Sequence, residues 1–313
     1  MFGNSRHDSN PLGVPLDELQ SVFAMTSLEG KRKNNSLHIQ RENYTTEITV
    51  VSPGNNLSPN GEIRAVVHVI TTLPEELNGF FGKRPAKTLA IFNSFASLGS
   101  LYFDSGRIRI GSRLTIFEHE DAWENLHFPL LLFASASGPE ALFGAIRRSF
   151  NKEEPAVGPS KWTESDFEFI EGYLSKISVC TTGGLGLTAE FSLSPGEMSA
   201  ILGDRNTALF QLFADQPHPE LGGGLFCLLE MPHQIRTQET AESLCMRLNK
   251  LEMEAEGLPP HFGAWCLGRL NNNLSYVMFL PNELYSTPGI ALNVSAWSIH
   301  RARWANEVLK SMR

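Results

Sequence analysis

Residues 74–84 read PEELNGFFGKR, and residues 195–205 read PGEMSAILGDR. The two stretches align without gaps, with identical Pro, Glu, Gly and Arg and with apolar residues at matching positions. Each predicts a short helix opened by proline, whose missing N–H costs nothing in the first helical turn. Self-similarity of this kind indicates a repeated structural unit.

The similarity extends on both sides of these stretches. Residues 91–96 (IFNSFA) align on residues 209–214 (LFQLFA) after a shift of three positions, and each predicts a Phe-rich strand. Upstream, residues 48–50 match residues 177–179. We therefore predict an α+β fold of two tandem repeats, each an antiparallel sheet flanked by helices, which together form a pseudo-dimer in one chain.

A charged segment with Pro and Gly, residues 151–160 (NKEEPAVGPS), divides the chain almost in half and is typical of a joint between domains. The predicted domains are an N-terminal α+β repeat over residues 1–152, with a loose tail at residues 1–13, and a C-terminal α+β repeat over residues 153–313. The segment 52–61 (SPGNNLSPNG) predicts a loop.

The second half has the clearer local signals. Residues 238–256 predict a helix with Thr237 as its cap and Gly257 as its stop, because apolar residues recur at helical spacing. The remaining predicted elements of this half are strands at 187–193, 225–229, 262–267 and 274–280 and a final helix at 290–310. In the first half we predict strands at 65–70, 101–103, 108–110 and 114–117, then an apolar helical region to residue 150, broken near Gly138 and Pro139. Both halves therefore end with a strand followed by a helix.

Composition limits the classes of function. The 313 residues carry a formal net charge of −8, which argues against binding nucleic acid through phosphate neutralisation. The basic run Lys31–Lys33 is short and predicts a solvated loop. The longest apolar stretch, residues 126–136, is too short to span a bilayer, which needs about 20 apolar residues. Four scattered cysteines predict reduced thiols, and we expect a cytoplasmic protein without a cofactor.

Three segments of the second half carry a family resemblance: HFGAWC at 261–266, YVMFLPN at 276–282 and RARWA at 301–305. Together they resemble the YbjN group, which is similar in fold to type III secretion chaperones. The resemblance covers about residues 175–313. It implies an antiparallel sheet flanked by helices, frequent dimers, and a role in binding, chaperoning or regulation. It brings no catalytic residues.

The densest set of possible metal ligands lies at residues 118–127 (EHEDAWENLH). Its candidates are His119, Glu120, Glu124 and His127, since carboxylate and imidazole groups can bind zinc or manganese. The spacing is not HExxH, and acidic residues at the start of a helix also have an ordinary role as partners of its dipole. A metal-dependent enzyme that uses the His119–His127 region is thus the alternative function.

The last predicted helix carries the most suggestive surface. Trp297, Arg301, Trp304 and Val308 fall on one helical face, and an arginine between two tryptophans can stack on both. Such a stripe is either a core face with a snorkelling arginine or an aromatic–arginine contact for a protein partner. Trp297, Arg301 and Trp304 are the predicted partner-binding residues.

The glycine-rich loops feed strands and therefore do not predict a phosphate site, which needs a helix N-terminus after the loop. No motif for nucleophilic catalysis is found, because Gly-x-Ser-x-Gly is absent. His218 predicts an exposed hairpin loop and His300 a structural side chain. We therefore expect a non-enzymatic protein- or peptide-binding module, chaperone-like or regulatory, whose partner is a protein. It would be a monomer with an internal pseudo-dimer, or a weak homodimer.

Overall fold

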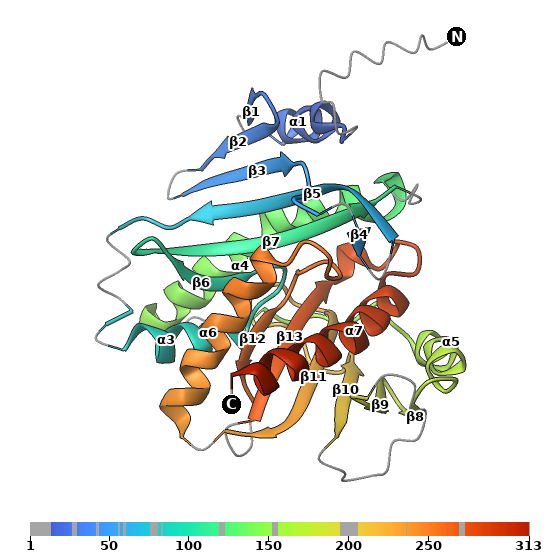
Figure 1. The fold of residues 1–313 in the computed structure, drawn as a ribbon. Coiled ribbons are helices and arrows are strands. Elements are labelled where there is room, and N and C mark those ends of the chain that lie inside the picture. The colour runs from blue at the N-terminus through green and yellow to red at the C-terminus, as the bar shows by residue number, and fades with distance from the viewer. Residues whose placement is uncertain are drawn as a thin grey trace, which may run out of the picture.

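The computed structural model of the chain describes residues 14–26, 30–41, 44–55, 57–58, 61–75, 81–82, 84–118, 123–151, 156–194, 206–235, 237–268 and 273–312. Its strands form two antiparallel sheets flanked by helices, as predicted (Figure 1). The first sheet uses strands up to Phe117 and the second uses strands from Val179 onward, so each half of the chain builds its own sheet. The expected tail 1–13 and the expected boundary at 152/153 lie outside the described residues.

The first unit runs from helix α1 (Leu16–Met25) to helix α4 (Phe128–Asn151), which follows the π-helical turn η1 (Trp123–His127). Helix α3 (Pro85–Asn93) interrupts its strands. The sheet has the order β1-β2-β3-β5-β7-β6, and the small strand β4 pairs with β5. The strands are β1 (Gly30–Lys33), β2 (Ser36–Gln40), β3 (Thr45–Val51), β4 (Leu57–Ser58), β5 (Gly61–Thr72), β6 (Ser100–Asp104) and β7 (Arg107–Phe117).

The second unit runs from helix α5 (Glu164–Leu174) to helix α7 (Ile290–Ser311), with helix α6 (Gln238–Glu254) in the middle and the short helix η2 (Asn282–Leu284) before α7. Read from its β8 edge, the sheet has the order β8-β9-β10-β11-β13-β12. The strands are β8 (Val179–Gly183), β9 (Gly186–Ser192), β10 (Thr207–Phe213), β11 (Gly224–Gln234), β12 (Ala264–Leu267) and β13 (Asn273–Pro281).

The two units repeat one topology. Apart from β4, each has a helix, four strands, a helix, two strands and a final helix, and the two sheet orders match strand for strand. α1 therefore corresponds to α5, α3 to α6 and α4 to α7. Even the first hairpin turns agree, since Asn34 and Gly184 both have a left-handed backbone, with φ of 52° and 56°. Asparagine and glycine are the residues that tolerate this conformation best.

Strand pairing fixes the equivalent residues. Ser100 opens β6 and pairs with Gly111, while Ala264 opens β12 and pairs with Val277. Moving two residues along β7 and β13 from these pairs makes Arg113 equivalent to Phe279. Moving three residues back from the strand starts makes Ser97 equivalent to His261.

The middle helices are docked onto the following hairpins in the same way. The side chain of Asn93 on α3 donates to the carbonyl of Leu101 (3.0 Å) and accepts from its N–H (2.8 Å). Asn249 on α6 makes the same two bonds to Trp265, at 3.0 and 2.7 Å. Leu101 and Trp265 are the second residues of β6 and β12, so the two asparagines are equivalent. Helix α6 then continues for another turn, which carries Glu252.

The units pack through equivalent surfaces. α3 and α6 contact each other, α3 contacts β12, and α6 contacts β6. Such self-complementary contacts are the pattern of a two-fold dimer. Two equivalent pairs of residues also form backbone hydrogen bonds between the units. Arg113 and His261 exchange N–H···O bonds of 3.0 and 2.7 Å, and the N–H of Phe279 donates to the carbonyl of Ser97 at 3.4 Å. The pseudo-dimer is thus a property of the fold.

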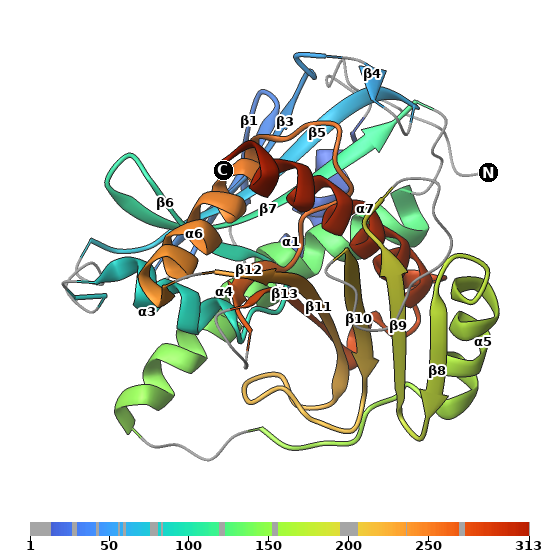
Figure 2. The same ribbon diagram turned by 60° about the horizontal axis from the view of Figure 1, so that its bottom comes forward.

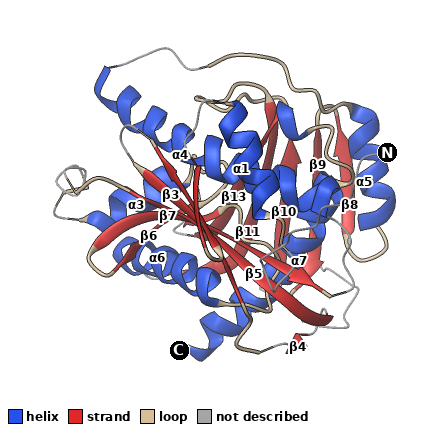
Figure 3. Cartoon of the chain, turned by 90° about the horizontal axis from the view of Figure 1, so that it is seen from above, coloured by secondary structure: helices blue, strands red, loops and turns tan. Residues whose placement is uncertain are grey.

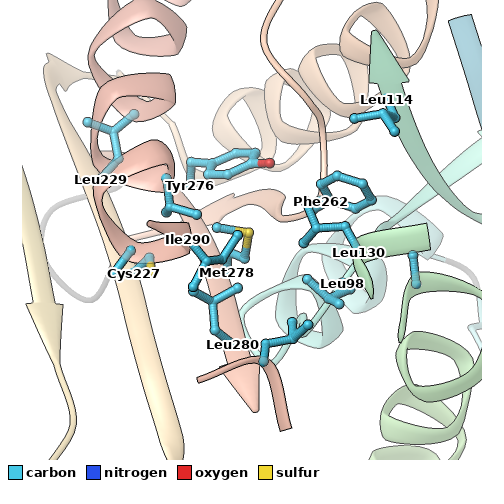
Figure 4. Close-up of a cluster of buried hydrophobic side chains, with 14 of the residues drawn as sticks. Leu98, Leu114, Leu130, Cys227, Leu229, Phe262, Tyr276, Met278, Leu280 and Ile290 are labelled. Atoms are coloured by element: carbon cyan, nitrogen blue, oxygen red, sulfur yellow. The ribbon is translucent and has the colours of Figure 1, made fainter. Parts of the chain in front are cut away.

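The core is continuous across this contact. Leu98, Leu114 and Leu130 of the first unit lie around Phe262 of the second, next to the β13 residues Met278 and Leu280 (Figure 4). All of these side chains are buried in one hydrophobic cluster. Burial of apolar surface therefore holds the two units together as well as each unit separately.

Two repeated units were predicted correctly, but from a wrong residue alignment. Residues 91–96 are not a strand: they finish α3 and the turn after it, whereas residues 209–214 contain most of β10. Pro85 favours the start of a helix here, since it stands at the first helical position. The buried face of this helix is formed by Leu89, Ala90 and Asn93. Pro74 follows β5, whereas residues 195–205, which follow β9, lie outside the described residues.

Three other expectations need correction. Helix α4 does not break near Gly138; the missing side chain lets the carbonyl of Leu98 approach, since a Cβ there would lie 2.4 Å from that oxygen. The expected loop 52–61 contains the short strand β4. Residues 31–33 form the edge strand β1. Within the described residues, one helix, Trp123–Ala145, is long and apolar enough to cross a membrane, and half of its most apolar stretch is buried in the protein.

Candidate functional site

A buried carboxylate, Glu252 on the extra turn of α6, lies where the two units meet. It accepts hydrogen bonds from His261 Nδ1 (2.9 Å), Trp265 Nε1 (2.8 Å) and Arg301 Nε (2.8 and 2.9 Å). Burial alone would raise its pKa, but Arg301 and His261 more than reverse this effect and hold the pKa at about 2. Glu252 is therefore ionised, and its charge is neutralised inside the protein.

Arg301 points into this cluster instead of lying between the two tryptophans. Its Nη2 donates to the carbonyl of Pro260 at 2.6 Å, and its guanidinium lies 4.1 Å from the ring centre of Tyr276. Only 2% of Arg301 is exposed, so it cannot contact a partner, and this part of the predicted binding stripe is wrong. Trp297 and Trp304 are partly exposed, and their role in binding stays a prediction.

Arg113 on β7 links the first unit to the same cluster. Its guanidinium donates to the backbone carbonyls of Glu252 (2.8 Å), Leu258 (3.2 Å) and Pro259 (2.8 Å), all in the second unit. Complete burial lowers its pKa to about 10, although the Glu252 carboxylate works in the opposite direction. Two buried arginines therefore hold the loop 258–260 between α6 and β12.

Ser100, His261 and Glu252 have the hydrogen-bond order of a hydrolase triad. Ser100 Oγ lies 2.8 Å from His261 Nε2, and His261 Nδ1 lies 2.9 Å from Glu252. All three side chains are completely buried, so no substrate can reach the serine oxygen in this structure. Burial also lowers the pKa of His261, against the pull of Glu252. The three side chains connect β6 of the first unit to the second unit. The sequence pattern does not predict them, because Ser100 lies 161 residues from His261.

Two of the four predicted metal ligands, Glu124 and His127, lie in the described residues. Glu124 is exposed and His127 is buried, while His119 and Glu120 lie outside the described residues. Within the described ranges, no group of three or more His, Cys, Asp and Glu side chains could hold a metal ion.

A cleft opens above the loop 258–260, with a volume of about 230 Å³. Both units contribute to it: β7 and η1 from the first, α7 and the loop from the second. The residues that line the cleft include Thr115, His127, Pro259, Asn293, Trp297 and His300. The cleft thus joins His127, a predicted metal ligand, with Trp297, a predicted partner contact.

A second candidate surface lies at the β8 edge of the second sheet, beside α5 (Figure 2). Phe169 and Tyr173 on α5 are 58% and 48% exposed, with ring centres 5.1 Å apart. Ile177, in the turn between α5 and β8, is 44% exposed. Val179 on β8 is 45% exposed, but it pairs with Glu190 on the face of the sheet opposite to Thr182, which bonds Glu171 on α5. We call Phe169, Tyr173 and Ile177 the α5–β8 patch. Exposed apolar side chains gathered in this way mark interaction sites.

A groove of about 270 Å³ lies next to the patch, between α5 and the start of α7. It is lined by Trp162, Asp166, Phe169, Tyr285 and Pro288, among others. Phe169 belongs to both surfaces, so the groove and the α5–β8 patch are continuous. Figure 3 shows α5 at the end of the molecule, beside β8 and β9.

The equivalent edge of the first sheet is protected against pairing with a strand of another chain. Its strand β1 carries Lys31, Arg32 and Lys33, and Arg32 pairs with Asp17 on α1. Lysine on an edge strand discourages pairing with other chains. Thr181 is the β8 equivalent of Lys31, because both pair across a matching hairpin, with Thr188 and His38 respectively. The two edges share a geometry but differ in charge.

No protein-family model and no curated protein matches the chain. One solved structure, DynU16 from the dynemicin biosynthetic locus, is matched over 93% of this chain and 91% of that chain. The identity is 10% and the TM-score is 0.13, so this likeness carries no argument about fold or function.

Proposed function

We propose that the protein is a non-enzymatic, cytoplasmic protein- or peptide-binding module of the chaperone-like kind, which holds an extended segment of a partner protein along β8. The observation that carries the proposal is the difference between the two edges. β1 is guarded by three basic residues, whereas β8 (VCTTG) has none, carries the exposed Val179 and directly follows the three exposed apolar side chains of the α5–β8 patch. An open edge can gain a strand through main-chain hydrogen bonds, a common mode of peptide recognition.

The charges around the patch indicate the chemistry of the bound segment. Helix α5 carries Glu164, Asp166, Glu168 and Glu171, and the whole chain is acidic. On the other face of the sheet, Glu190 pairs with Val179. A segment that alternates apolar residues with lysine or arginine would place its apolar side chains on the α5 side and its cations on the side of Glu190. Complementary charge of this kind favours correct encounter and register.

The resemblance of the second half to the YbjN group supports the same role, since it implies an antiparallel sheet, flanking helices and a binding function. The repeat supports a monomer: the contact between its units is already made within one chain, where it does not depend on concentration.

Panning of a displayed library of random 12-residue peptides on the full-length protein would test the proposal. We expect enriched peptides that alternate apolar and basic residues. The best synthetic peptide should bind with a Kd that Thr181→Lys raises at least tenfold, because the substitution gives β8 the guard of β1. The reverse substitution on the other edge, Lys31→Thr, is the matched control and should leave the Kd unchanged in calorimetry.

Two results would contradict the proposal. Failure to enrich any peptide, with well-folded protein by circular dichroism, would argue against peptide binding. Equal binding by the wild type and the Thr181→Lys variant would move the site away from β8.

A further inference from the structure

The groove between α5 and the start of α7 has features that strand addition at β8 does not use. It has a volume of about 270 Å³ and is lined by three aromatic side chains, Trp162, Phe169 and Tyr285. Phe169 and Tyr285 are 58% and 38% exposed, whereas Trp162 is only 3% exposed, so the indole lies at the base of the groove. Exposed aromatic rings gathered in one groove are candidates for contact with a partner.

The rings are held in place by contacts within the protein. Trp162 and Tyr285 meet edge to face, with ring centres 5.3 Å apart. Phe169 lies 5.1 Å from the ring of Tyr173, one turn further along α5. Rigid aromatic side chains supply contact area at a low cost in conformational entropy, which favours affinity. The groove therefore offers a preformed aromatic surface that continues onto the α5–β8 patch.

Trp162 also offers an unused hydrogen-bond donor. Its indole N–H makes no hydrogen bond to any residue that the structure describes, whereas those of Trp123 and Trp265 each donate to a carboxylate at 2.8 Å. A tryptophan as buried as this one usually has a partner for its indole N–H. A ligand in the groove with free backbone carbonyls would supply the missing acceptor.

The charge in the groove favours a cation. Asp166 is the one charged residue among the described lining residues. Its Oδ2 accepts from the N–H and the hydroxyl of Thr163, at 2.8 and 2.9 Å, and lies 3.5 Å from the hydroxyl of Tyr285. Its Oδ1 makes no hydrogen bond within the described part of the chain. This oxygen can therefore accept from the side chain of an arginine or a lysine.

The charges around the lining have the same sign. The two segments that form the groove, residues 160–176 and 282–293, carry four further carboxylates and two lysines. The carboxylates are Glu164, Glu168, Glu171 and Glu283, and the lysines are Lys161 and Lys176. Among the described residues, no salt bridge neutralises any of these carboxylates or Asp166. The local excess of negative charge attracts a basic ligand.

A polyproline II helix with basic residues matches the rings, the donor and the charge. It has no internal hydrogen bonds, so its carbonyls can accept from a donor such as the Trp162 indole. Proline-rich segments dock in aromatic-lined grooves, and their preformed shape reduces the entropy lost on binding. Three residues complete one turn, so a basic residue at every third position stays on one face.

We infer that this groove binds a proline-rich, basic segment of a partner protein in the polyproline II conformation. Its prolines lie against Trp162, Phe169 and Tyr285, and an arginine or lysine of the segment pairs with Asp166. The site is separate from main-chain pairing at β8, although Phe169 belongs to both surfaces, and it does not depend on the function proposed for that edge.

Three peptides with blocked ends test the inference on the full chain: (Pro-Pro-Arg)₃, the neutral (Pro-Pro-Gln)₃ and the flexible (Gly-Gly-Arg)₃. We expect calorimetry to show saturable binding of (Pro-Pro-Arg)₃ that is about tenfold tighter than binding of either other peptide. In NMR spectra, (Pro-Pro-Arg)₃ should shift the indole N–H signal of Trp162, which Trp162→Phe identifies by its disappearance.

Two pairs of variants, each checked for folding by circular dichroism, place the peptide. Ser286→Phe should weaken binding about tenfold, because Ser286 is exposed and lines the groove, so that a ring there takes the place of the ligand. Ser311→Phe, the same change at an exposed position at the other end of α7, should leave binding unchanged. Asp166→Asn keeps an acceptor for the cap of α5 but removes the charge, so it should reduce the preference for (Pro-Pro-Arg)₃ over (Pro-Pro-Gln)₃. Glu307→Gln, on an exposed position of α7 outside the groove, should preserve that preference.

Equal affinity for the arginine and glutamine peptides would overturn the role of the carboxylates, and equal affinity for (Gly-Gly-Arg)₃ would overturn the polyproline II conformation. Absence of saturable binding, an unmoved Trp162 signal, or binding that persists in Ser286→Phe would overturn the site itself. Thr181→Lys should leave (Pro-Pro-Arg)₃ binding intact, so failure of the β8 proposal and failure of this one are distinguishable. A loss of binding in that variant would place the peptide on β8 and contradict the groove.

Discussion

At the scale of single residues, Glu252 explains how a charged cluster survives inside the protein. An isolated buried carboxylate would be protonated, whereas this one is neutralised by Arg301 and receives further bonds from His261 and Trp265. The arrangement is stable only when complete, because removal of one member leaves an uncompensated buried charge.

We therefore expect Glu252→Gln to lower the free energy of unfolding by about 3 kcal/mol, as for other broken buried ion pairs. Glu254→Gln provides the control, since Glu254 is an exposed residue of the same helix, 3.9 Å from Lys250. It should cost no more than about 0.5 kcal/mol. Urea unfolding of the three proteins measures both values. Equal stability of the two variants would show that the cluster contributes nothing.

His218 is a second residue whose role differs from its predicted one. It is fully buried, not exposed, and its Nε2 lies 3.0 Å from the carbonyl of Phe95 in the other unit. Its Nδ1 accepts from the N–H groups of Glu220 (3.0 Å) and Leu221 (3.2 Å), so the neutral ring must carry its proton on Nε2. Burial lowers its pKa to about 4; the bond to Phe95 acts the other way, and the charge of Arg148 adds a smaller lowering effect.

This lowered pKa predicts a loss of stability in mild acid. Between about pH 6.5 and 4 the unfolded chain takes up a proton that the folded chain refuses, so stability falls as the pH falls through this window. His218→Asn keeps an acceptor for the turn but does not titrate. We expect the wild type to lose about 2 kcal/mol more than this variant between pH 7 and pH 5. Parallel stability curves in urea titrations would contradict the assignment.

At the scale of elements, the asparagine that docks each middle helix is the clearest mark of the repeat. Asn93 and Asn249 are both buried, and each satisfies one N–H and one C=O of the following strand. A buried backbone group left without a partner costs ~1–3 kcal/mol.

Asn93→Leu and Asn249→Leu should therefore each lower the free energy of unfolding by about 2–4 kcal/mol, and by similar amounts. Chemical denaturation of the two variants tests this equivalence. A cost at one position less than half of that at the other would mean that the two helices are not docked alike.

Many elements could be predicted from local pattern. Helix α6 was placed from the spacing of its apolar residues and from Thr237, whose Oγ1 accepts from the N–H of Thr240 at 3.2 Å. The strand-then-helix ending of both halves is confirmed. The predicted alignment of the halves is wrong for two reasons. IFNSFA at 91–96 resembles a strand in composition, but its first residues belong to the helix that begins at Pro85. In addition, Asn93 precedes its partner Leu101 by 8 residues, whereas Asn249 precedes Trp265 by 16.

The buried cluster and the cleft could not be predicted in this way. Ser100 and Arg113 meet the second unit only when the two units pack, and Arg301 is 49 residues from Glu252, so no local spacing relates these side chains. The sequence marks Trp297 as a partner contact and His127 as a metal ligand, but it does not show that both line one cleft beside the loop 258–260. Sequence pattern finds elements, whereas sites assembled between units need the packing.

At the scale of the whole molecule, the two units depend on each other. Arg113 of the first unit is completely buried, and the carbonyls that its guanidinium meets belong to the second unit. A separated first half would expose this side chain together with apolar residues such as Leu98 and Leu114.

We expect the intact chain to be a monomer of 34.7 kDa. Residues 14–151 and 156–313 should aggregate when produced separately and should form a soluble complex of one copy of each when produced together. Light scattering after gel filtration measures both mass and stoichiometry. Two halves that each remain folded and monomeric would contradict the dependence, and a stable dimer of the full chain would contradict the monomer.

Arg113 and Phe279 occupy equivalent positions, both buried, and yet one is a cation and the other an aromatic ring. In a true homodimer every substitution appears twice, so a cation gained on one side of the axis is also imposed on the other. A chain that encodes both copies escapes this constraint. Each unit can accept substitutions that the other does not share. This is why a charged cluster can form on one side of the axis and an apolar contact on the other.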